Sequence, residues 1–156
     1  MKRQFWIMKC EPEIFSIDDL ATAKEYFWDG VRNYQVRNMF RDEMKVGDKA
    51  LFYHSSTKEI GVVGEMEVIK TATPDQTQFD TKSKYYDPKS TKENPRWLGP
   101  TVRFVSKLPK IVTLEQIKLN PSFSDLPLIK KGNRLSVMKI TEEHYKMILK
   151  LSREKA

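Results

Sequence analysis

Strand-like apolar segments alternate irregularly with short helical segments along this chain, and this pattern constrains the fold more than any other feature. The strand-like segments are continuous or alternating runs of apolar and β-prone residues, as in buried and half-buried strands. They lie at residues 4–8, 49–54, 60–69, 102–108 and 134–140. Because their spacing does not give regular βαβ units, we expect an α+β fold: a curved mixed sheet, or a small barrel, flanked by short helices.

Capping residues predict where the helices begin. Ser16, Asn33 and Thr141 each precede a helical segment, and Thr113-Leu114-Glu115-Gln116 has the form of a capping box. We expect helices at residues 17–24, 34–43 and 114–119, and a final amphipathic helix after Thr141. The side chains expected to point inward from the second and last helices are Tyr34, Met39, Phe40, Tyr145, Ile148, Leu149 and Leu151.

Glycine and proline mark the connections. Val46-Gly47-Asp48 and Gly132-Asn133 are predicted turns, and Gly61 and Gly64 predict a bulge or a close backbone approach within a strand. Residues 73–100 contain four prolines and little periodicity. A segment this long is uncommon as a structureless loop. We therefore expect it to be functional, or partly ordered by its aromatic residues, which are Phe79, Tyr85, Tyr86 and Trp97.

Composition excludes several classes of protein. The 156 residues fit one domain, residues 1–156, and 39% hydrophobic residues argue against disorder. No apolar run approaches the ~20 residues that cross a bilayer, and residues 5–8 are too short for a signal peptide core. We therefore expect an intracellular, cytoplasmic protein. One cysteine, two distant histidines and no phosphate-loop or HExxH motif predict no disulfide, metal site or cofactor.

Positive charge is concentrated in the last third of the chain. The net charge is +7, and residues 96–156 hold 13 Lys/Arg against 5 Asp/Glu, whereas residues 1–95 are nearly neutral. Such asymmetry favours a polyanionic partner, although a solvated basic surface has the same composition. The side chains expected to bind phosphate are Arg32, Arg37, Lys130 and Lys131.

Residues 28–38 and 51–56 each gather aromatic rings, hydrogen-bonding side chains and basic groups. Aromatic faces stack on bases, and amides, hydroxyls and imidazoles bind base edges, so these segments predict a nucleobase pocket with nucleic acid attached. Gly30 would let the backbone approach a ligand. For Trp28 and His54 a structural role is the alternative, and Trp97 is either an anchor or a lid.

Other side chains leave the chemistry open. Arg134 and Ser136 would share one face of a strand, where Arg134 would meet a phosphate or base edge unless it pairs with a carboxylate. Cys10 and His54 are nucleophile and base types, but we find no catalytic constellation around them. Cys10 is better explained as a small packed residue.

Several motifs together resemble the EVE domain over nearly the whole chain. In chain order, the motifs are Phe5-Trp6-Ile7-Met8-Lys9-Cys10-Glu11-Pro12, Phe15-Ser16-Ile17-Asp18-Asp19-Leu20, Trp28-Asp29-Gly30-Val31-Arg32-Asn33-Tyr34-Gln35, Phe52-Tyr53-His54-Ser55, Tyr85-Tyr86-Asp87-Pro88-Lys89-Ser90, Pro95-Arg96-Trp97 and Arg134-Leu135-Ser136-Val137. The family usually has serine where this chain has Cys10, which puts any contact by that hydroxyl in doubt.

The resemblance implies a PUA-like fold and a binding module related to YTH, ASCH and PUA domains, associated with modified bases and notably modified cytosine in DNA. In YTH domains, the tryptophan that corresponds to Trp28 is a wall of an aromatic cage. The resemblance therefore implies Trp28 as a pocket wall. The other pocket candidates carried over are Lys9, Gly30, Asn33, Tyr53, His54, Ser55, Arg134 and Ser136.

These observations favour a non-catalytic reader of a modified or flipped nucleobase. Trp28 would cover one face of the base, with Tyr53 or Trp97 near the other, and Asn33, His54 and Ser55 would bind its edge. The partner would be DNA or RNA that carries a modified base. The alternatives are a PUA-type RNA-binding adaptor, an enzyme on a modified base that uses His54 or Cys10, and a small-molecule sensor.

Overall fold

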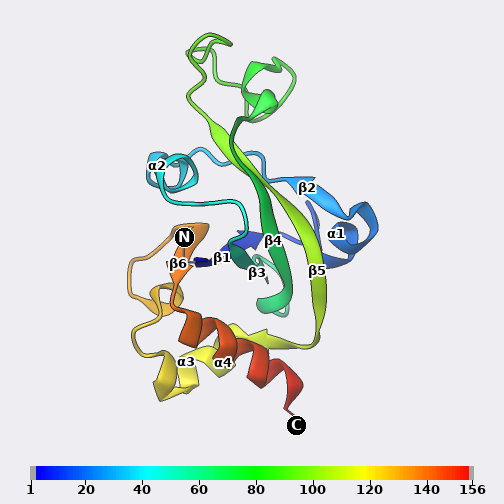
Figure 1. Cartoon of the computed structure of the whole chain (residues 1–156), viewed down its shortest axis with the longest axis vertical. Helices are drawn as coiled ribbons and strands as arrows, with labels where there is room; N and C mark the ends of the chain where they lie inside the picture. Colours follow the sequence, from blue (N-terminus) through cyan, green and yellow to red (C-terminus); the bar gives the residue numbers. More distant parts are fainter. Residues whose placement is uncertain (1–2, 155–156) are drawn as a thin grey trace.

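A six-stranded mixed sheet forms the centre of the computed structural model, which describes residues 3–154 (Figure 1). The strands are β1 (Phe5–Cys10), β2 (Glu25–Phe27), β3 (Lys49–His54), β4 (Gly61–Pro74), β5 (Leu98–Thr113) and β6 (Val137–Ile140). Their order is β2-β5-β4-β3-β1-β6, in which only β1 and β3 are parallel. The α+β prediction is confirmed. The barrel alternative is wrong, because within residues 3–154 the sheet ends at β2 and β6 without closing.

The helices are α1 (Ile17–Ala23), α2 (Tyr34–Asp42), α3 (Leu114–Leu119) and α4 (Glu142–Arg153). The predicted caps are confirmed: Ser16, Asn33, Thr113 and Thr141 each accept a backbone N–H from the first turn. Residues 3–154 also contain three short 3₁₀ helices: η1 (Gln76–Phe79), η2 (Pro121–Phe123) and η3 (Pro127–Ile129). None of the helices within residues 3–154 has the length and hydrophobicity of a transmembrane span.

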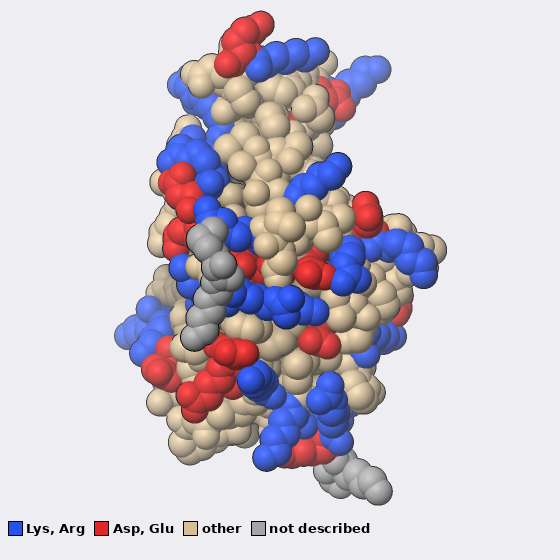
Figure 2. Space-filling model, viewed as in Figure 1, with Lys and Arg blue, Asp and Glu red and all other residues tan. Residues whose placement is uncertain are grey.

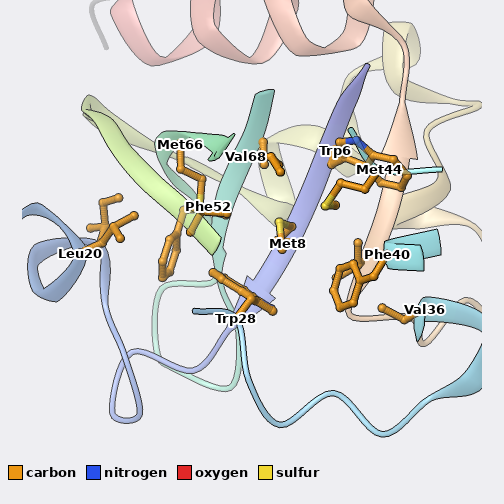
Figure 3. Close-up of a cluster of buried hydrophobic side chains, with 14 residues drawn as sticks. Trp6, Met8, Leu20, Trp28, Val36, Phe40, Met44, Phe52, Met66 and Val68 are labelled. Carbon is orange, nitrogen blue, oxygen red and sulfur yellow. The ribbon is translucent and has the colours of Figure 1, made fainter. Parts of the chain in front are cut away.

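Each face of the sheet carries its own core. Alternation along β1 places Trp6 and Met8 on one face, where they pack with Phe52 and with residues of α1 and α2, as Figure 3 shows. Ile7 points to the other face, against Tyr145 and other residues of α4. The site described below lies at the edge of the first cluster.

Three predicted inward-facing positions need correction. Tyr34 is 49% exposed because it occupies the first position of α2, where its ring packs against Trp97 with centroids 4.7 Å apart. On α4, Tyr145 and Ile148 are buried as predicted, but Leu149 and Leu151 are only half-buried, and His144 and Ser152 are buried with the predicted pair.

Strand β4 is longer than predicted, and so is β5, and residues 75–97 between them form a lobe that projects away from the sheet (Figure 1). The backbone pairing is irregular at Gly64, where a side chain would collide with Ile17, so the predicted close approach is confirmed. Within the lobe, the Gln78 amide donates to Asp75 O and Trp97 O, both at 2.8 Å. The lobe is therefore ordered around the buried Gln78 side chain as well as around the buried Trp97 ring.

Candidate functional site

A cavity of about 520 Å³ lies where the end of β1 meets the segments before α2, after β3 and before β6, beside the lobe. Two backbone hydrogen bonds join these segments. Lys9 N donates to Ser136 O at 2.8 Å, and Ser55 N donates to Cys10 O at 3.2 Å. The residues that line the cavity are Lys9, Cys10, Glu11, Ile14, Tyr26, Trp28, Asp29, Gly30, Val31, Arg32, Asn33, Ser55, Ser56, Tyr85, Arg134 and Ser136.

Trp28 is both a core residue and a wall of this cavity. Its side chain is 4% exposed, and the ring packs edge-on against Phe52 and Tyr26, at centroid distances of 5.5 and 5.8 Å. Figure 3 shows it beside Met8 and Phe52, at the margin of the buried cluster. The backbone N–H of Trp28 donates to Pro100 O at 2.9 Å, which holds the residue against β5. The two roles that the sequence left as alternatives therefore occur together.

Gly30 is the point at which the lobe contacts the cavity. Its φ of +80° belongs to the left-handed region, and a Cβ there would lie 2.6 Å from Tyr85 Cζ. Gly30 N donates to Asp75 Oδ2 at 2.8 Å. The close backbone approach expected at this glycine is made by the lobe's own tyrosine, which places an aromatic ring at the cavity.

Arg32 lines the cavity, but its guanidinium joins the segment before α2 to the lobe. All of its N–H donors are used within the protein: they bind Tyr85 O twice, Val31 O, Asp75 Oδ2 and Thr77 Oγ1. This conformation leaves no donor for the phosphate contact expected of Arg32. Arg37 lies outside the cavity, over the Tyr34 ring, and donates to Arg96 O and to Asn38 Oδ1.

Polar groups at the cavity remain available for a ligand's edge. Asn33 Oδ1 caps α2 by accepting from Val36 N, whereas Asn33 Nδ2 donates to no group among residues 3–154. Burial lowers the pKa of the Lys9 ammonium, which lies 5.7 Å from the Tyr53 ring centroid. Arg134 and Ser136 also line the cavity, although they precede β6 and are not part of a strand as predicted.

Three predicted pocket residues lie elsewhere. Tyr53 is 2% exposed and packs on the opposite face of the sheet, because it alternates with Phe52 along β3. His54 Nε2 accepts the Ile17 N–H at 3.1 Å and so supports the start of α1. Trp97 is buried in the lobe, where its Nε1 donates to Asp87 Oδ2 at 2.8 Å. Lys130 and Lys131, predicted to bind phosphate, are exposed between η3 and Arg134 and do not line the cavity.

Tyr26, Asp29 and Tyr85 line the cavity although they were not among the predicted pocket residues. The Tyr26 hydroxyl donates to Asp29 Oδ1 at 3.0 Å, and burial raises the pKa of that phenol further than the neighbouring carboxylate does. Tyr26 and Trp28 are two positions apart at a strand end, a spacing that places side chains on one side and was a usable signal. Nothing local in the sequence indicated that Tyr85 would reach the cavity.

Cys10 lines the cavity as a protonated thiol. Burial, followed by the charges of Asp29 and Glu11, raises its pKa to about 11. A thiol with a raised pKa is a poor nucleophile at neutral pH. Among the residues that the structure describes, no three His, Cys, Asp or Glu side chains are grouped to hold a metal ion.

Known proteins resemble this chain over almost its full length. A family model described as the EVE domain matches residues 4–151. Thymocyte nuclear protein 1 of Gallus gallus is 40% identical over 169 residues, which cover 96% of this chain and 69% of that protein. A hypothetical protein from Leishmania major has a structure similar at a TM-score of 0.91 with 44% identity, covering 97% of this chain and 95% of that one.

A further solved structure is that of human THYN1 in complex with DNA that contains 5-methylcytosine. It matches at a TM-score of 0.91 with 36% identity and covers 98% of this chain and 99% of that one. The PUA-like fold that the resemblance implied is thereby confirmed. The match of the family model and the relatives together show that the chain belongs to the EVE domain family.

Proposed function

We propose that this chain, as one domain over residues 1–156, is a non-catalytic reader that takes a modified nucleobase, 5-methylcytosine in DNA, into the cavity beside Trp28. The observation that carries the proposal is the Trp28 ring, held edge-on by Phe52 and Tyr26 while it lines a cavity of about 520 Å³. A cavity of this volume falls in the range of small-molecule sites. The complex of the human relative with 5-methylcytosine DNA supports the same ligand.

The arrangement of side chains follows from this placement. The base stacks on Trp28, Tyr85 lies on the lobe side, and Asn33, Ser55 and Ser136 bind polar atoms of the base edge. Lys9 and Arg134 are the cations placed to meet the phosphates that flank a flipped nucleotide. Tyr85 takes the place that was predicted for Tyr53 or Trp97.

The absence of catalysis is part of the proposal. The two side chains considered for an enzyme are separated in role: Cys10 carries a thiol with a pKa of about 11, and His54 is bound to the start of α1. Incubation with modified nucleotides and oligonucleotides, followed by mass spectrometry, should return unchanged substrate. Turnover that disappears on Cys10→Ala would overturn this part.

The cytoplasmic localisation expected from the sequence stays a prediction, which imaging of a tagged chain would test.

Binding measurements test the reader proposal directly. Duplex DNA with one central 5-methylcytosine, the same duplex with cytosine, and RNA versions of both should be compared at one salt concentration. We expect the tightest binding to methylated DNA. A fully buried methyl group contributes up to ~0.8 kcal/mol, or roughly fourfold in affinity. Equal affinity for both DNA duplexes would contradict a reader, and a preference for RNA regardless of methylation would support the PUA-type adaptor.

A further inference from the structure

Asp29 presents a carboxylate to the cavity directly after the Trp28 wall. One of its oxygens, Oδ1, accepts the hydroxyl hydrogen of Tyr26 at 3.0 Å. Its second oxygen accepts no hydrogen bond from residues 3–154, and none of the ion pairs formed in that range includes Asp29. The carboxylate is therefore held in place on one side and has acceptor capacity left on the other.

The neighbouring carboxylate of Asp75 shows the contrast. Asp75 is buried and accepts from Gly30 N, Arg32 Nη1 and both the N–H and hydroxyl of Thr77, so its oxygens are satisfied by the protein. Asp75 has a structural role that its contacts explain. No contact within the described chain explains the remaining acceptor of Asp29.

The charge of Asp29 acts on the cavity that it lines. It contributes, after burial, to the raised pKa of the Cys10 thiol and of the Tyr26 phenol. Lys9 and Arg134 line the same cavity, and among the described residues neither forms an ion pair with Asp29. A ligand group that meets Asp29 is therefore favoured if it donates a hydrogen bond and disfavoured if it offers another acceptor.

We propose that Asp29 selects bases that carry an exocyclic amino group, accepting the N4 amino hydrogen of a cytosine and rejecting the O4 carbonyl of thymine or uracil. This inference rests on the proposed function. Carboxylates accept from cytosine N4, and each good contact of this kind contributes ~1–3 kcal/mol of discrimination. Trp28 then recognises the face of the base, whereas Asp29 distinguishes 5-methylcytosine from thymine, which has the same methyl group.

The test compares oligonucleotides that differ only in the target base. Each carries 5-methylcytosine, thymine, cytosine or uracil opposite an abasic site, so that no base loses a pairing partner on flipping. We expect the wild-type chain to bind 5-methylcytosine over thymine, and cytosine over uracil, each by ~5- to 150-fold. Asp29→Asn, whose amide can donate to O4, should bring both ratios close to one.

A matched control removes the same charge elsewhere. Asp18 is exposed and pairs with Lys107 away from this cavity. Asp18→Asn should therefore leave both binding ratios unchanged. It should still reproduce any general gain in affinity for nucleic acid that comes from removing a negative charge. Equal wild-type binding of 5-methylcytosine and thymine, or unchanged ratios in folded Asp29→Asn, would overturn the inference.

A further probe needs no variant. An oligonucleotide with N4,N4-dimethylcytosine lacks both amino hydrogens and should bind the wild-type chain at least fivefold more weakly than cytosine. Equal binding would overturn the inference even if Asp29→Asn did not fold. Failure of the reader proposal is distinct, because it appears as equal binding of 5-methylcytosine and cytosine, whereas the cytosine-to-uracil ratio still reports on Asp29.

Discussion

Single residues at this site combine structural and binding roles, and Trp28 is the clearest case. Its ring packs nearly perpendicular to Phe52 and Tyr26 in the core and also lines the cavity, so truncation to alanine tests both roles together. Truncation of a buried tryptophan to alanine lowers the free energy of unfolding by ~3–5 kcal/mol. A variant that keeps an aromatic ring separates binding from folding.

Trp28→Phe should retain the fold and lose affinity for 5-methylcytosine DNA. The smaller ring offers less stacking area, and stacking on an aromatic contributes ~1–3 kcal/mol per base. We expect a loss of several-fold in titrations with labelled duplex, with an unchanged circular dichroism spectrum. Trp6→Phe, in the same cluster but not lining the cavity, is the control. Equal losses in both variants would mean that Trp28 acts through core packing alone.

Gly30→Ala should disturb the cavity, because its new Cβ would lie 2.6 Å from the Tyr85 ring in addition to the strain of a positive φ. Gly132→Ala has a similar φ of +83° and no atom within 4 Å, so it isolates the backbone strain. Gly30→Ala should lower the free energy of unfolding by more than Gly132→Ala does, and should weaken DNA binding. The double variant with Tyr85→Ala should recover part of the stability. Additive effects in urea denaturation would contradict the clash.

At the scale of secondary structure, separate elements are joined by single polar side chains. His54 at the end of β3 accepts the first N–H of α1, which a short helix otherwise leaves without an acceptor. Asp75 at the end of β4 accepts from Gly30 and Arg32 and so holds the lobe at the cavity. Each contact makes one element depend on another.

The His54 contact predicts a loss of stability in mild acid. Burial lowers the pKa of His54 below its ordinary value near 6.5, and Nε2 can accept the Ile17 N–H only while it is unprotonated. The unfolded chain therefore binds the proton more readily. The contribution of His54 to the free energy of unfolding is fully present above pH ~6.5. It declines as the pH falls from there to the lowered pKa, by at most ~1.4 kcal/mol per pH unit.

Urea denaturation across this pH range measures the effect. His54→Gln should be less stable than the wild type at neutral pH and should show a flatter decline between pH 7 and 5. A wild-type decline that persists unchanged in His54→Gln would assign the titration to other groups.

The lobe should loosen in Asp75→Asn. The substitution removes the charge that faces Arg32 and replaces one acceptor with a donor, and breaking a buried pair costs on the order of 3 kcal/mol. We expect faster amide hydrogen exchange across residues 75–97 and weaker DNA binding, because Tyr85 is no longer held at Gly30. Asp80→Asn, in an exposed turn of the same lobe, should change neither. Unchanged exchange in Asp75→Asn would contradict the tether.

At the scale of the whole molecule, the net charge of +7 should govern affinity for nucleic acid without setting specificity. Basic residues are distributed over much of the face seen in Figure 2, interspersed with acidic ones. The net charge therefore favours a polyanionic partner, but it does not indicate where the phosphates of that partner would lie.

Salt dependence tests this distribution. Log affinity for an oligonucleotide should fall linearly with log salt, by ~0.7–0.9 per phosphate contact. Lys130→Glu with Lys131→Glu should flatten the slope, because both side chains are exposed in the segment that leads to Arg134. Lys146→Glu with Lys150→Glu makes the same charge change on the exposed face of α4. Equal slopes in the two double variants would show a general charge effect rather than contacts near the cavity.

The helix starts and most strand positions were predicted correctly, because these depend on neighbouring residues. Ser16, Asn33, Thr113 and Thr141 cap helices as predicted, since a side-chain oxygen reaches an N–H only two or three positions away. The resemblance of the motifs also indicated the family and placed Trp28, Gly30 and Asn33 at one site.

Which side chains line the cavity depends on contacts between distant parts of the chain, and local sequence patterns do not specify these contacts. Tyr53 and His54 belong to the predicted motif, but alternation along β3 and the position of α1 direct them away from the cavity. Tyr85 reaches the cavity because the lobe folds back onto Gly30, a contact between residues far apart in the sequence. Local patterns specify local hydrogen bonds, whereas strand register and the packing of distant segments depend on the whole chain at once.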